Sequence, residues 1–107
     1  MTTFDKREEG FEKKFALDEE LRFKAMARRN KLFGLWAAEK LGLSGPEADA
    51  YAKEVIKAAF LEAGDDHVLR KVMGDLEAAK VAQSDHQLRR TMDELMQTAV
   101  DQLKAGI

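Results

Sequence analysis

Apolar residues recur at helical spacing along most of the chain. The clearest stripe runs from Ala48 to Phe60 in steps of three and four residues, and similar stripes cover 68–79 and 88–103. A further stretch, residues 18–41, has an apolar second half from Leu32 to Ala38, which we expect at the centre of the fold. Because none of these helices is stable without burying its stripe, the pattern predicts an all-α fold.

Glycine, proline and capping residues divide these stretches. Gly42 suits a left-handed helix end, Pro46 suits a first helical turn, and Ser84 followed by Gln87 fits a capping box. At a further break, Gly64 closes one helix and the next two aspartates are expected to cap the following one. The breaks predict a four-helix bundle over residues 18–107, with helices at about 18–41, 46–62, 66–81 and 85–105.

Residues 1–17 form an arm that differs from the rest. Phe4, Phe11 and Phe15 fall on one helical stripe, and charged residues surround them. Gly10 costs a helix roughly 1 kcal/mol relative to alanine, so we expect the arm to be flexible and potentially helical, ordering when it binds. The pattern leaves two interpretations open: the arm extends the first helix and packs on the bundle, or it fits a groove of a partner.

Composition narrows the function classes. The chain has 107 residues, no cysteine, two histidines and a net charge of -2, which disfavours a disulfide framework, a metal site and binding to nucleic acid. We expect no signal peptide, because the first residues mix acids and bases without an apolar core. No apolar run is long enough to insert into a membrane. These features predict a cytoplasmic protein.

Candidate chemistry is sparse. His67 and His86 stand at predicted helix starts without further ligands, so we expect neither catalysis nor metal binding, and no enzyme. One basic cluster stands out in the first helix, formed by Lys24, Arg28, Arg29 and Lys31. Such a cluster is most often a solvated face or a source of interhelical ion pairs. The alternative is an anion site that binds ADP or ATP weakly.

Several stretches carry a family resemblance. They are Phe23-Lys24-Ala25, Ala27 to Leu32, Gly34 to Ala38, Ala50 to Ile56 and Val68 to Val72, preceded in the arm by Phe4-Asp5, Arg7-Glu8, Phe11-Glu12 and Lys14-Phe15-Ala16. With them the chain resembles, over essentially its whole length, the small ATPase inhibitor proteins that form the zeta subunit of alphaproteobacterial F-type ATP synthase.

The resemblance implies a function for the arm. In this family a mobile amino-terminal arm enters the catalytic head between the alpha, beta and gamma subunits and blocks rotation in the hydrolytic direction. By that resemblance the partner-binding residues are expected to be Phe4, Asp5, Arg7, Glu8, Phe11, Lys14 and Phe15. It implies no cofactor, a monomer when free, and a place peripheral to the inner membrane. Two alternatives remain: a nucleotide-binding or nucleotide-sensing bundle, and a structural or assembly adaptor.

Overall fold

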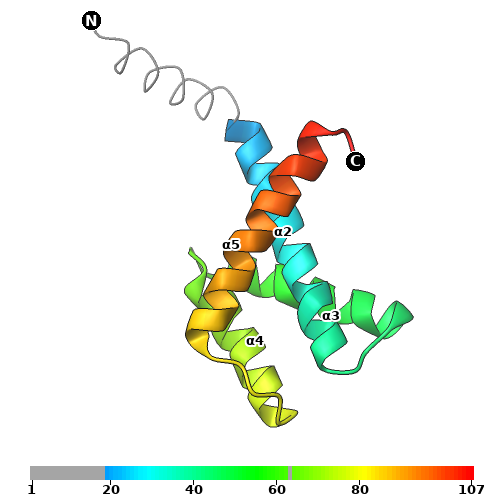
Figure 1. Cartoon of the computed structure of the whole chain (residues 1–107), viewed down its shortest axis with the longest axis vertical. Coiled ribbons are helices and arrows are strands. Elements are labelled where there is room, and N and C mark those ends of the chain that lie inside the picture. The colour runs from blue at the N-terminus through cyan, green and yellow to red at the C-terminus, as the bar shows by residue number, and fades with distance from the viewer. Residues whose placement is uncertain (1–18, 63) are drawn as a thin grey trace, which may run out of the picture.

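The computed structural model describes residues 19–62 and 64–107, which form four helices and no strand. The helices are α2 (Glu19–Lys40), α3 (Gly45–Leu61), α4 (Asp66–Ala78) and α5 (Asp85–Lys104). Helices α2 and α5 run antiparallel along the long axis, α3 crosses α2, and α4 lies at the end away from the amino terminus of α2 (Figure 1). The all-α four-helix prediction is confirmed for this part of the chain.

One apolar core joins the four helices. The apolar half of α2 supplies its centre, as predicted: Phe33, Ala37 and Ala38 are fully buried. Trp36 is half-buried and stacks on Phe33, with ring centroids 5.7 Å apart. The other helices contribute further fully buried side chains to the same core, among them Val55, Val68, Val72, Leu76 and Leu88. Each of the four helices α2 to α5 therefore packs one face into a single shared core.

Helix ends follow the local signals. Gly42 has a φ of 79°, Pro46 lies in the first turn of α3, and Ser84 and Gln87 make the predicted capping box. The end of α4 differs from the predicted range 66–81, because Lys80 adopts a φ of 62° and the Val81 N–H donates to the Leu76 carbonyl at 2.8 Å. This bond closes the helix as a Schellman motif three residues early, with lysine where glycine is usual.

Tyr51 joins the core to the rim, as its single polar atom requires. Its ring is buried, and its hydroxyl donates to Asp75 Oδ2 at 2.8 Å. Lys71 donates to the same oxygen at 2.7 Å and lies over the Tyr51 ring. Burial raises the pKa of the Tyr51 phenol, and the hydrogen bond to the Asp75 carboxylate raises it further. The folded protein therefore holds the phenol in its neutral form.

We predict that Tyr51 ionises only when the protein unfolds. An unfolded tyrosine has a pKa of about 10, and the folded value lies above it, so this contribution to stability is complete below about pH 10 and is lost as the pH rises further. Tyr51 is the single tyrosine, so its ultraviolet absorbance can be compared with helical circular dichroism during alkaline titration. Tyrosinate absorbance in a fully helical protein would contradict the prediction. In the matched variant Tyr51→Phe, the loss of stability above about pH 10 should be shallower.

Candidate functional site

The fold places the four residues of the basic cluster of α2 in different surroundings. Arg29 is buried, and its guanidinium donates two bonds to Asp65, at 2.7 and 3.2 Å, beside the start of α4. The same guanidinium donates to the side-chain oxygen of Asn30, which is also buried. Asp65 was expected to cap α4, but its side chain makes no capping bond and binds Arg29 instead. Arg29 therefore links α2 to the connection between α3 and α4 through this ion pair.

The other three basic residues point elsewhere. Arg28 donates to Gln102 of α5 at 3.4 Å, Lys24 pairs with Glu20 one turn before it, and Lys31 is exposed. At about 100° per residue, Lys24, Arg28 and Lys31 share one side of α2, away from Arg29. An anion on this side would meet no free backbone N–H groups, because the cluster lies within a continuous helix. Nucleotide binding here stays a prediction.

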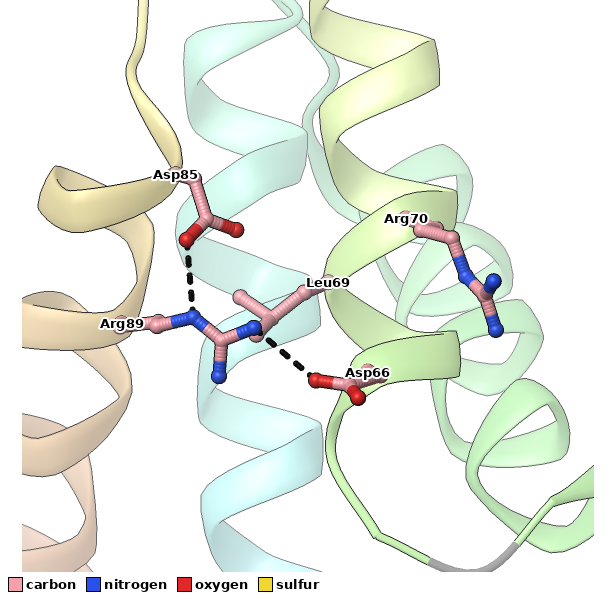
Figure 2. A pocket seen from close by; sticks show the side chains of 5 residues that line it. All are labelled: Asp66, Leu69, Arg70, Asp85 and Arg89. Atoms are coloured by element: carbon pink, nitrogen blue, oxygen red, sulfur yellow. Dashed lines mark hydrogen bonds and ion pairs between the residues drawn. The ribbon is translucent and has the colours of Figure 1, made fainter.

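A shallow hollow lies between α4 and α5 (Figure 2). It measures about 250 Å³, below the usual range for small-molecule sites, and is lined by Asp66, Leu69, Arg70, Asp85 and Arg89. Arg89 bridges Asp66 at 2.9 Å and Asp85 at 2.8 Å. Hydrogen bonds to these carboxylates raise the pKa of Arg89. Arg89 therefore satisfies both lining carboxylates and links α4 to α5, while Arg70 pairs with Glu62 outside the lining.

Histidines and carboxylates form no metal centre in the part of the chain that the structure describes. His67 Nδ1 lies 3.3 Å from Glu62, which also pairs with Arg70. No group of three or more potential ligands is gathered among residues 19–62 and 64–107. None of the helices in these ranges has the length and apolar character needed to cross a membrane.

The partner-binding residues predicted in the arm lie outside the described residues. They are Phe4, Asp5, Arg7, Glu8, Phe11, Lys14 and Phe15. Within the described part, the structure adds a feature that the sequence analysis did not single out. Several large apolar side chains are exposed: Phe23 and Met26 on α2, Phe60 and Leu61 at the end of α3, and Ile107. In the sequence, the exposure of Phe23 was indicated by its position near the start of α2, before the apolar half of that helix.

Comparison with known proteins gives a consistent assignment. A model of the family ATPase inhibitor subunit zeta matches residues 1–102. A protein whose structure was solved by solution NMR is 50% identical to this chain, with a TM-score of 0.71, over 81% of this chain and 99% of that one. No curated protein matches. Because the family match spans both the arm and the bundle, the chain belongs to the ATPase inhibitor subunit zeta family.

Proposed function

We propose that this chain inhibits ATP hydrolysis by an F-type ATP synthase. Residues 1–17 insert as a helix between the alpha, beta and gamma subunits of the catalytic head and block its rotation. The observation that carries the proposal is the family match, which begins at residue 1 and so includes the arm. This function places the chain in the cytoplasm, as a free monomer or held at the catalytic head, peripheral to the inner membrane.

The separate bundle core supports a role for the arm in binding. Each described helix supplies fully buried side chains to one core, including Phe33 of α2, Val55 of α3, Leu76 of α4 and Leu88 of α5. The bundle therefore has its own source of stability, and in the proposed function the arm contacts the partner. Three phenylalanines on one stripe can act as apolar anchors, while Asp5, Arg7, Glu8 and Lys14 set the register through their charges.

The test is steady-state ATP hydrolysis by the isolated catalytic head, titrated with three proteins. These are the full chain, a truncation that lacks residues 1–17, and a full-length variant with Phe4, Phe11 and Phe15 all changed to alanine. The full chain should inhibit, and the other two should not, while circular dichroism shows equal helical content in the bundle. If the full chain leaves hydrolysis unchanged, the proposed function is wrong.

We expect Phe11→Ala alone to weaken inhibition by about 2 kcal/mol, which is roughly a thirtyfold rise in the inhibition constant. Phe11 is the middle residue of the stripe, and central aromatic anchors carry most of the binding energy in such interfaces. The matched control is Lys13→Ala, because Lys13 lies on the opposite side of a helical arm. An unchanged inhibition constant for Phe11→Ala would remove this residue from the binding surface.

A further inference from the structure

The first turns of α2 project beyond the main core. Among the residues that the structure describes, the last turns of α5 lie beside α2 at this end of the molecule, while α3 and α4 lie towards the other end (Figure 1). Ala25 of α2 and Ala99 of α5 are fully buried, and Arg28 reaches Gln102 across the same interface. The side of α2 that faces α5 is therefore covered here.

Phe23 and Met26 lie on an uncovered side of the same turns. Phe23 is 68% exposed and Met26 is 37% exposed. Seven and eleven residues after Phe23, the same side of α2 carries Asn30 and Gly34, both of which are buried. Gly34 is covered because α3 crosses there, against Ala52. One side of α2 is therefore covered by α3 further along the helix. Near the start of the helix, the same side is uncovered and carries apolar side chains.

We propose that Phe23 and Met26 extend the binding surface of the arm, so that the cleft that receives the arm also packs on the first turns of α2. This inference rests on the proposed function. Phe23 follows Phe15 by eight residues, a distance of about 12 Å in a helix and at most about 28 Å in an extended chain. A partner that holds Phe15 is therefore bound at most about 28 Å from this surface along the chain.

The spacing of Met26 agrees with one continuous surface. Met26 follows Phe15 by eleven residues, which is close to three full helical turns. On a helix that continued from the arm into α2, Met26 would lie on the stripe of Phe4, Phe11 and Phe15, and Phe23 would lie about 80° to one side of Phe15. Glu20 and Lys24 pair with each other beside these side chains and supply a polar border. The partner surface that fits is an apolar wall with a polar rim.

The experiment compares two phenylalanines that are both exposed on the bundle. Phe23→Ala, and the double variant with Met26→Ala, should raise the inhibition constant for the catalytic head about tenfold or more, because apolar contact area is lost at the interface. Phe60→Ala is the matched control, since Phe60 is 76% exposed and lies at the end of α3 rather than on the first turns of α2. It should inhibit like the unchanged chain. Equal urea midpoints for all variants would exclude a folding defect.

A second readout does not depend on activity. A photoreactive phenylalanine analogue at position 23 should cross-link to subunits of the inhibited catalytic head, whereas the same analogue at position 60 should not. If the full chain inhibits, the arm variants do not, and Phe23→Ala inhibits normally without cross-linking at position 23, this inference is overturned and the proposed function stands. If the full chain fails to inhibit, the proposed function fails first.

Discussion

Asp65→Ala is expected to lower the free energy of unfolding by about 2 to 3 kcal/mol, because it leaves the guanidinium of Arg29 buried without its counterion. The Arg29 side chain is 8% exposed, and after the substitution Asn30 would be its remaining partner among the bonds described. The Asp65 side chain is 41% exposed, and for this reason the expected loss is smaller than for a fully buried pair. Urea unfolding followed by circular dichroism measures it.

The neighbouring residue provides the control. Asp66 also pairs with an arginine of another helix, Arg89, but the two side chains are 75% and 50% exposed. Solvent and salt screen such a pair, so Asp66→Ala should cost much less, and added salt should weaken its contribution more than that of Asp65. If the two alanine variants lost equal stability, burial of Arg29 would not be the source of the difference.

The ends of the helices could be predicted because their signals are local. The glycine at position 42 and the capping box of Ser84 with Gln87 each act within a few residues, so a pattern in the sequence is enough to place them. Lys80 shows the limit of this reasoning. A lysine in the left-handed conformation gives no local signal, and the end of α4 depends on the bonds that its backbone makes.

The role of each basic residue in α2 could not be predicted, because it depends on contacts distant in sequence. Arg29 and Asp65 are 36 residues apart, and Arg28 and Gln102 are 74 apart. Spacing places Lys24, Arg28 and Lys31 on one side of the helix, but it does not tell which neighbouring arginine is buried. The same holds for Phe23, whose exposure follows from where α3 crosses α2.

Gly34→Ala is expected to lower the free energy of unfolding by about 2 kcal/mol or more. A Cβ atom at this position would lie 2.7 Å from the Cα of Ala52 and 3.2 Å from the Cβ of Val55, so α2 and α3 would have to move apart. Backbone cannot rotate away as a flexible side chain can, and overpacking of this kind costs about 1 to 3 kcal/mol or more. Separation would also loosen the contacts of Val55 in the core. Together these costs outweigh the gain of about 1 kcal/mol in helix propensity.

The same substitution at Gly74 should have the opposite sign. Gly74 lies within α4, and a Cβ atom there would meet no neighbouring atom within 4 Å, so alanine adds helix propensity without overpacking. We expect Gly74→Ala to raise the free energy of unfolding by about 0.5 to 1 kcal/mol. Thermal and urea unfolding of the two variants measure the difference directly. If both substitutions raised the free energy of unfolding, α2 and α3 would be able to separate at little cost. If Gly74→Ala raised it and Gly34→Ala lowered it, the close approach of the two helices at Gly34 would be the cause of the loss.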